Sequence, residues 1–142
     1  MKEYVSWKQY DIYIDLIVDW VCMRGLNDIA IGAVYGLPRG GLPIAVSLSH
    51  RLGLPLLMDY YDRKIVTDKK ILVVDDIADT GETLKGFDTN KNIICTLHHT
   101  EESIVLPEFS VFNKNDKWIV YPWETKDSET IPDYIVEKKI YE

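Results

Sequence analysis

Apolar residues recur at helical spacing near the start of the chain and form continuous runs further along it. Ser6 is typical of a helix N-cap, and the positions after it alternate between an apolar face and a charged face. The apolar positions are Trp7, Tyr10, Ile14, Ile17 and Val21. This pattern predicts a first helix that ends near Gly25, because glycine commonly stops a helix.

The apolar runs predict a series of strands separated by short helices and loops. The runs cover residues 29–36, 55–61, 70–76, 92–99, 109–113 and 117–122. A helix from Leu42 to Gly53 is expected between the first two runs. After the third run only a short helix is expected, because Gly86 weakens it. Residues 62–69 read as a polar loop. The order of elements predicts an α/β fold with a mostly parallel central sheet flanked by helices.

Length and composition narrow the range of functions. The chain has 142 residues, 46% of them hydrophobic, which predicts a single domain over residues 1–142 with a substantial core. A formal net charge of −7 argues against a nucleic-acid partner. The sequence lacks a signal peptide and a long apolar span, so we expect a cytoplasmic protein with no membrane partner. Cys22 and Cys95 lie in apolar runs and are expected to be buried free thiols.

The third strand ends in an unusual group of polar residues, read in the sequence as ILVVDDIADTGET. Two adjacent carboxylates, Asp75 and Asp76, precede a glycine-containing turn with hydroxyls at Thr80 and Thr83. Backbone amides of such a turn can bind a phosphate, while carboxylates accept hydrogen bonds from sugar hydroxyls or hold a hydrated Mg²⁺. The pattern favours a phosphorylated sugar as ligand. The alternative is that the acidic pair only ends the strand and caps the turn.

A second turn, LPRGG, follows the first strand. Gly40 and Gly41 permit backbone conformations that other residues avoid, and Arg39 is a fork-shaped donor suited to phosphate oxygens. In a parallel sheet both turns lie beyond the carboxyl ends of strands, on one edge where ligands bind. Taken alone, LPRGG also fits an ordinary turn with a solvated arginine. A P-loop or a dinucleotide-binding turn is excluded, because neither glycine pattern is present.

These motifs together resemble a known family. VVDDIADTGET is similar to the phosphoribosyl pyrophosphate signature of type I phosphoribosyltransferases, and LPRGG is similar to their pyrophosphate loop. KWIVYPWE, at residues 117–124, resembles the C-terminal part of the enzymes in the xanthine–guanine branch of this family. The resemblance implies a small hood built from terminal segments, transfer of a phosphoribosyl group to a 6-oxopurine with release of pyrophosphate, Mg²⁺ as cofactor, and a homodimer or homotetramer.

The resemblance also implies roles for individual residues. Asp75 and Asp76 are expected to contact the ribose hydroxyls and Mg²⁺, and Asp79 to accept a proton near N7 of the purine. Trp118 is expected to stack on the base, whose edge would contact the Ile119 backbone and His99. The expected pyrophosphate ligands are Arg39 and Gly40. The expected 5′-phosphate cradle is Ala78, Asp79, Thr80, Gly81, Glu82 and Thr83.

Three departures from the family pattern leave alternatives open. His98 and His99 stand where 6-oxopurine enzymes usually carry a lysine that contacts the base, although both could be a strand-end pair with no ligand. Residues 61–69 are short for a loop that closes over the site, so water could compete with the base. Glu82 replaces a common glycine, and its carboxylate must point away from phosphate. The alternatives are a transferase for adenine or a pyrimidine, or a non-catalytic regulator that binds phosphoribosyl pyrophosphate.

Overall fold

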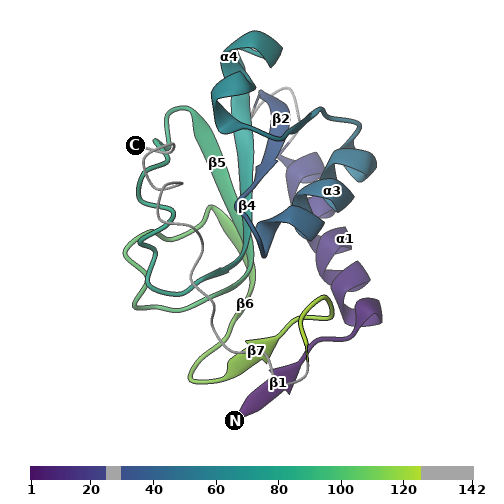
Figure 1. Cartoon of the computed structure of the whole chain (residues 1–142), viewed down its shortest axis with the longest axis vertical. Helices are drawn as coiled ribbons and strands as arrows, with labels where there is room; N and C mark the ends of the chain where they lie inside the picture. Colours follow the sequence, from purple (N-terminus) through teal and green to yellow (C-terminus); the bar gives the residue numbers. More distant parts are fainter. Residues whose placement is uncertain (25–29, 126–142) are drawn as a thin grey trace.

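The computed structural model describes residues 1–24 and 30–125, and a sheet lies at its centre with helices along one side (Figure 1). The elements in chain order are β1 (Lys2–Tyr4), α1 (Trp7–Met23), β2 (Ile31–Gly36), α3 (Gly41–Leu52), β3 (Leu56–Leu57), the 3₁₀ helix η1 (Tyr60–Asp62), α4 (Arg63–Val66), β4 (Lys70–Ala78), β5 (Asn92–His99), β6 (Phe109–Asn113) and β7 (Trp118–Val120).

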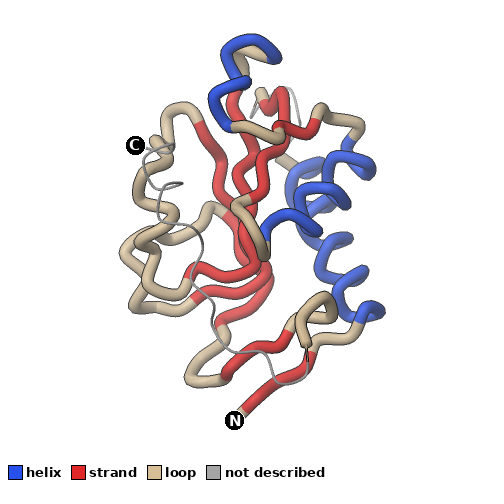
Figure 2. The backbone as a smooth tube through the Cα atoms, in the orientation of Figure 1, coloured by secondary structure: helices blue, strands red, loops and turns tan. Residues whose placement is uncertain are grey.

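The central sheet has five strands in the order β3-β2-β4-β5-β6, and every neighbouring pair is parallel. Figure 2 shows these strands running side by side, with α1 and α3 along one face. The predicted α/β fold with a mostly parallel sheet is therefore confirmed. Parallel pairing also places the carboxyl ends of the strands on one edge, where Gly36 of β2 pairs with Val74 of β4 and His99 of β5 pairs with Asn113 of β6.

The first helix begins where the sequence predicts. The hydroxyl of Ser6 accepts a hydrogen bond from the Gln9 amide at 3.1 Å, and the Gln9 side chain accepts one from the Ser6 amide at 2.9 Å. This reciprocal capping box satisfies two amide donors that the first turn would leave without partners. The buried face of α1 consists of Tyr10, Ile14, Ile17 and Val21, all of which the periodicity predicts.

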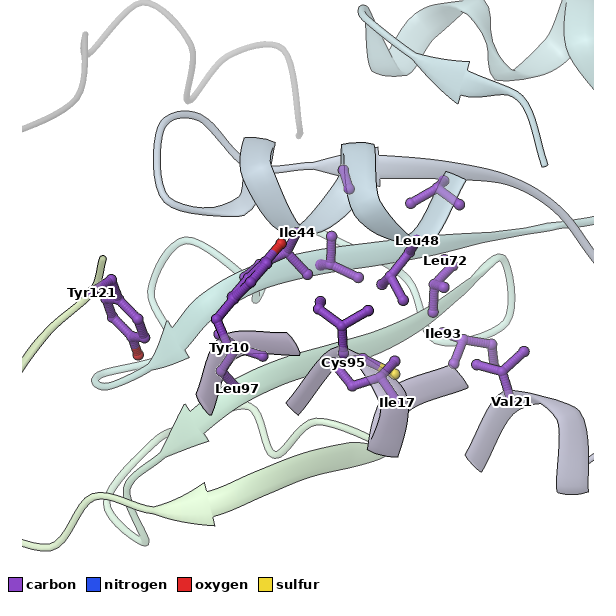
Figure 3. Packing of buried hydrophobic residues seen from close by; sticks show 14 of the residues in the cluster. Tyr10, Ile17, Val21, Ile44, Leu48, Leu72, Ile93, Cys95, Leu97 and Tyr121 are labelled. Atoms are coloured by element: carbon purple, nitrogen blue, oxygen red, sulfur yellow. The ribbon is translucent and has the colours of Figure 1, made fainter. Parts of the chain in front are cut away.

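The core lies on both faces of the sheet. On one face, α1 and α3 pack against β4 and β5, and Figure 3 shows side chains such as Ile17, Leu48 and Leu72 meeting there. On the other face, which no long helix of the described residues covers, the cluster includes Tyr35, Tyr60 and Phe87. The central strands β2, β4 and β5 are apolar on both sides because both sides are buried.

The two ends of the described chain meet in a separate two-stranded sheet, which we call the hood. β1 pairs in parallel with β7, so that Lys2 lies opposite Trp118 and Tyr4 opposite Val120. The Trp118 amide donates to the Met1 carbonyl at 3.0 Å. The sequence predicts β7 but not β1, whose residues are exposed and carry no apolar pattern.

Residues 55–69 differ from the prediction of a full strand followed by a polar loop. The strand is limited to Leu56–Leu57, because the Asp59 carboxylate accepts a hydrogen bond from the Tyr61 amide at 2.9 Å and starts a turn. The ring of Tyr60 then enters the second core cluster. The 3₁₀ helix η1 replaces the end of the expected strand, and α4 lies within the expected loop, so this connection is folded where the sequence suggests an irregular segment.

Other expectations also need correction. The short helix expected after β4 is a series of turns, because the amides of Leu84 and Lys85 both donate to the Gly81 carbonyl and Gly86 follows. Cys22 is exposed rather than buried, since it lies one position beyond the buried face of α1, whereas Cys95 is buried as expected. The predicted stop at Gly25 lies outside the described residues. Within the described residues, none of the helices is both long and apolar enough to span a membrane.

Substitution of Ser6 and Gln9 tests how much the capping box stabilises the start of α1. Ser6→Ala should lower the free energy of unfolding by about 1 kcal/mol, because the N-cap hydroxyl is lost. Gln9→Ala should cost less, and the double variant should cost less than the sum, because the two hydrogen bonds support each other. Urea denaturation of the four proteins measures these differences, and purely additive losses would contradict the reciprocal box.

Candidate active site

A cleft of about 280 Å³ lies at the edge of the sheet where β2 and β4 end. Its walls are the turn between β2 and α3 and the loop that follows β4. The lining residues are Pro38, Gly40, Asp75, Asp76, Ile77, Ala78, Asp79, Thr80, Gly81, Thr83 and Leu84. The two turns that the sequence singles out therefore meet in one cleft, as parallel strand order requires.

The turn between β2 and α3 lies directly against the end of β4. The Leu37 amide donates to the Val74 carbonyl at 3.0 Å, which joins the turn to the strand. A β-carbon at Gly41 would collide with the Val74 carbonyl oxygen, and one at Gly40 would collide with the carboxylate of Asp76. Glycine at both positions is thus required by close approach. The Pro38–Arg39 peptide bond in this turn is cis.

The loop after β4 is held from outside by residues 100–105. Gly81 has a positive φ of 83°, and a β-carbon there would meet the Ser103 hydroxyl and the Ile104 amide. The Thr100 hydroxyl donates to the Asp79 carbonyl at 2.6 Å, and the Ile104 amide donates to the Thr80 carbonyl at 2.9 Å. This support fixes the loop without using its cleft side. The sequence carries no signal for it, because the supporting residues follow a different strand.

The paired carboxylates at the end of β4 occupy different surroundings. The Asp75 carboxylate accepts a hydrogen bond from the Asp76 amide at 2.8 Å. The pKa of Asp76 is raised from its ordinary value of 3.8 to about 6, mainly by burial and also by the nearby Glu124 carboxylate. A carboxyl that is costly to ionise in the free protein is well placed to bind a cation or to accept hydrogen bonds from hydroxyls.

A hydrogen-bonded chain connects Asp76 to the segment after β7. The Tyr121 hydroxyl donates to the Asp76 carbonyl at 3.0 Å and lies 2.9 Å from Nδ1 of His98. Since a hydroxyl carries one proton and a carbonyl only accepts, the second bond must run from His98 Nδ1–H to the Tyr121 oxygen. Burial lowers the pKa of His98 to about 4, so the ring is neutral at physiological pH. His98 therefore has a structural role here.

A lysine that sequence reasoning missed lies beside Asp79. The ammonium of Lys114, just after β6, is 3.7 Å from the Asp79 carboxylate, and its side chain is only 15% exposed, against 59% for Asp79. The Lys114 amide donates to the His99 carbonyl at 2.9 Å. The family pattern places a lysine after β5, whereas Lys114 follows the neighbouring strand β6. Only the pairing of His99 with Asn113 reveals that these two positions are adjacent.

Some predicted residues lie beside the cleft rather than in its lining. Arg39 is exposed between two lining residues, and Glu82 points to Lys85, with which it forms an ion pair at 2.6 Å. His99 Nδ1 is hydrogen-bonded with the Ser110 hydroxyl at 3.0 Å. In the hood, Trp118 is 45% exposed and Ile119 is buried.

Known structures with this fold include several phosphoribosyltransferases. A purine phosphoribosyltransferase from Pyrococcus horikoshii is 29% identical, with a TM-score of 0.69 and coverage of 93% of this chain and 99% of that one. A xanthine-guanine-hypoxanthine phosphoribosyltransferase from Helicobacter pylori is 18% identical, with a TM-score of 0.69 and coverage of 87% and 93%, which supports the fold alone. The predicted resemblance to type I phosphoribosyltransferases is confirmed.

The sequence match to a curated protein covers a smaller part of both chains. An orotate phosphoribosyltransferase from Sulfurisphaera tokodaii is 31% identical over 93 residues, which cover 57% of this chain and 48% of that enzyme. The match therefore spans about half the length of that relative. No family model matches the chain.

The raised pKa of Asp76 predicts that ionisation of this carboxyl lowers the stability of the ligand-free protein. The folded protein holds this proton more tightly than the unfolded chain, so stability should fall as the pH rises from 3.8 to about 6. Asp76→Asn should therefore raise the free energy of unfolding at pH 7.5 by up to about 3 kcal/mol, and by much less at pH 4.5.

Denaturant unfolding without ligand at both pH values measures this difference. Asp68→Asn, which removes an exposed carboxylate, is the control and should change stability little at either pH. Equal effects of Asp76→Asn at the two pH values would contradict the assignment.

Proposed function

We propose that this chain, which has the fold and sequence resemblance of the type I phosphoribosyltransferases, transfers the phosphoribosyl group of phosphoribosyl pyrophosphate to a 6-oxopurine. The observation that carries the proposal is the single cleft in which Asp75, Asp76 and the Gly81 loop face the Gly40 turn. An activated sugar phosphate presents three anionic or hydroxylated parts, and this cleft offers a matching group for each. The products are a purine nucleoside monophosphate and pyrophosphate.

The loop after β4 suits the 5′-phosphate. Ala78, Gly81 and the hydroxyl-bearing Thr80 and Thr83 line the cleft, and its backbone is held in place by residues 100–105. Because the loop is already fixed, its amides and hydroxyls can bind phosphate with little loss of conformational entropy. Glu82 is directed to Lys85, so its charge does not oppose the phosphate.

The acidic pair suits the ribose and the Mg²⁺ that accompanies pyrophosphate. Within the described part of the chain, His, Cys, Asp and Glu form no group of three or more that could hold a metal. Two carboxylates fit Mg²⁺ nonetheless, since this ion keeps several waters and takes its other ligands from substrate oxygens. Asp75 and Asp76 would hold it, and a cation would favour the ionised form of Asp76. The ion would stabilise negative charge on the departing pyrophosphate.

The base end is where Asp79 and Lys114 lie together. Asp79 accepts the proton that the attacking base nitrogen loses, while Lys114 donates to an oxygen on the base. A lysine ammonium can only donate, so it matches a carbonyl oxygen and not the amino group of adenine. Trp118 stacks on the base, and the Ile119 backbone and His99 bind its edge. Lys114 thus supports the 6-oxopurine assignment that the missing lysine after β5 left open.

The chemistry is displacement of pyrophosphate from the anomeric carbon. The bond from that carbon to the pyrophosphate oxygen breaks as the bond to the base nitrogen forms, through a state with positive charge on the sugar ring. Arg39 and the amides of the Gly40 turn stabilise the leaving group. Because the bonds that change lie in the substrates, the protein accelerates the reaction mostly by positioning them and by stabilising charge.

Orotate is the second candidate for the base. Its support is the 31% identity to an orotate phosphoribosyltransferase. Lys114 is compatible with it too, because orotate carries carbonyl oxygens and a carboxylate. A non-catalytic regulator of transcription is less favoured, because the net charge of −7 opposes binding to nucleic acid.

An assay with a panel of bases tests the function directly. With phosphoribosyl pyrophosphate and Mg²⁺, we expect nucleotide from hypoxanthine, guanine or xanthine, and little from orotate or adenine, measured by chromatography. Asp79→Asn should lower kcat by about 100-fold or more while the affinity for phosphoribosyl pyrophosphate stays nearly unchanged. A product with orotate alone would replace the purine assignment, and no product with any base would favour a binding protein.

Lys114 can be tested against a matched lysine in the same turn. Lys114→Met should lower kcat/KM for the oxo base by about 10- to 100-fold, the loss of one charged hydrogen bond of roughly 1.5–3 kcal/mol, with little change in KM for phosphoribosyl pyrophosphate. Lys117→Met is the control, because Lys117 pairs instead with Glu3 at 3.3 Å on the surface. Equal effects of the two substitutions would remove Lys114 from the base site.

A further inference from the structure

The connection between β3 and β4 is anchored on the second face of the sheet. The Tyr60 hydroxyl donates to the Asn92 side chain at 2.6 Å, and its ring packs against Tyr35 and Phe87 at centroid distances of 5.4 and 5.0 Å. The Arg63 guanidinium lies over the Tyr60 ring, 4.7 Å from its centroid. These contacts hold η1 and the start of α4 on a buried aromatic cluster.

The rest of the connection leads to the edge of the sheet opposite the cleft. Thr67 packs so tightly on Gly32 that a β-carbon at Gly32 would overlap the Thr67 side chain. The Lys70 amide donates to the Ala30 carbonyl at 2.8 Å, and Lys70 pairs with Ile31 at the start of β2. Figure 1 shows α4 at the end of the molecule beyond the amino-terminal ends of β2 and β4. Residues 58–69 therefore contribute nothing to the cleft lining.

The proton acceptor at the base end is open to water. The side chain of Asp79 is 59% exposed, and its ion-pair partner Lys114 approaches from one side at 3.7 Å. Among the described residues, the cleft takes its walls only from the β2–α3 turn and from the end of β4 with the loop after it. Water can thus reach the group that would accept a proton from the base.

A sugar cation reacts with any nucleophile that reaches it, and enzymes exclude water to prevent this. We propose that the same cleft hydrolyses phosphoribosyl pyrophosphate when no base is bound, an inference that rests on the proposed function. The bond from the anomeric carbon to the pyrophosphate oxygen breaks, and water oxygen bonds to that carbon. One water proton passes to Asp79 and then to solvent, and the products are ribose 5-phosphate and pyrophosphate.

The test measures pyrophosphate release by the full chain with Mg²⁺ and phosphoribosyl pyrophosphate, with and without hypoxanthine. Without base, we expect equal amounts of pyrophosphate and ribose 5-phosphate, above the enzyme-free rate and saturable by phosphoribosyl pyrophosphate. In ¹⁸O-water the pyrophosphate should stay unlabelled, because the carbon–oxygen bond breaks. Asp79→Asn should lower base-free release at least about 10-fold, as expected for loss of a proton acceptor, while the control Asp68→Asn keeps it.

The outcomes separate the two proposals. Nucleotide formation with base but no release without it overturns the hydrolysis and leaves the transferase. Release without base but no nucleotide with any base supports the hydrolysis and overturns the transfer. Release that carries label in pyrophosphate, or that persists in Asp79→Asn, does not come from this chemistry and overturns the hydrolysis. Absence of both products overturns both.

Discussion

The close contact between the glycine turn after β2 and the end of β4 is the constraint on which the site depends. The Leu37 amide bonds to the Val74 carbonyl, and the space beside Gly40 is filled by the Asp76 carboxylate. A side chain at Gly40 or Gly41 would collide with the end of β4, so the turn lies directly against the strand and the two line one cleft. The parallel order of the sheet brings the turns to the same edge, and the glycines allow them to touch.

The same contact places the carboxylate of Asp76 in surroundings that disfavour its charged form. Asp76 is partly buried and its pKa is raised to about 6, which costs stability at neutral pH. A fold alone gains nothing from such a group, whereas a site for hydroxyls and a cation does. The same reasoning applies to the open Asp79 beside Lys114, where charge is placed at the cleft edge rather than distributed over the surface.

The sequence predicted the features whose causes are local. The N-cap at Ser6, the buried run of β4 and the glycines of the β2–α3 turn each carry their signal within a few residues. It failed where tertiary contacts decide. Tyr60 leaves the strand because its ring enters a core cluster, and Lys114 joins Asp79 only through the pairing of β5 with β6. The roles of Trp118, Ile119 and His99 at a base stay predictions.

The hydroxyl of Tyr121 links two halves of the site that the chain builds from distant segments. It follows the hood strand β7 by one residue, and it is bonded both to the Asp76 carbonyl and to the neutral His98 ring. These hydrogen bonds therefore connect the hood to the end of β4. Under the proposed function, a base bound at the hood and a sugar phosphate bound at β4 would each act on the other through this side chain, and any such effect on affinity would be reciprocal.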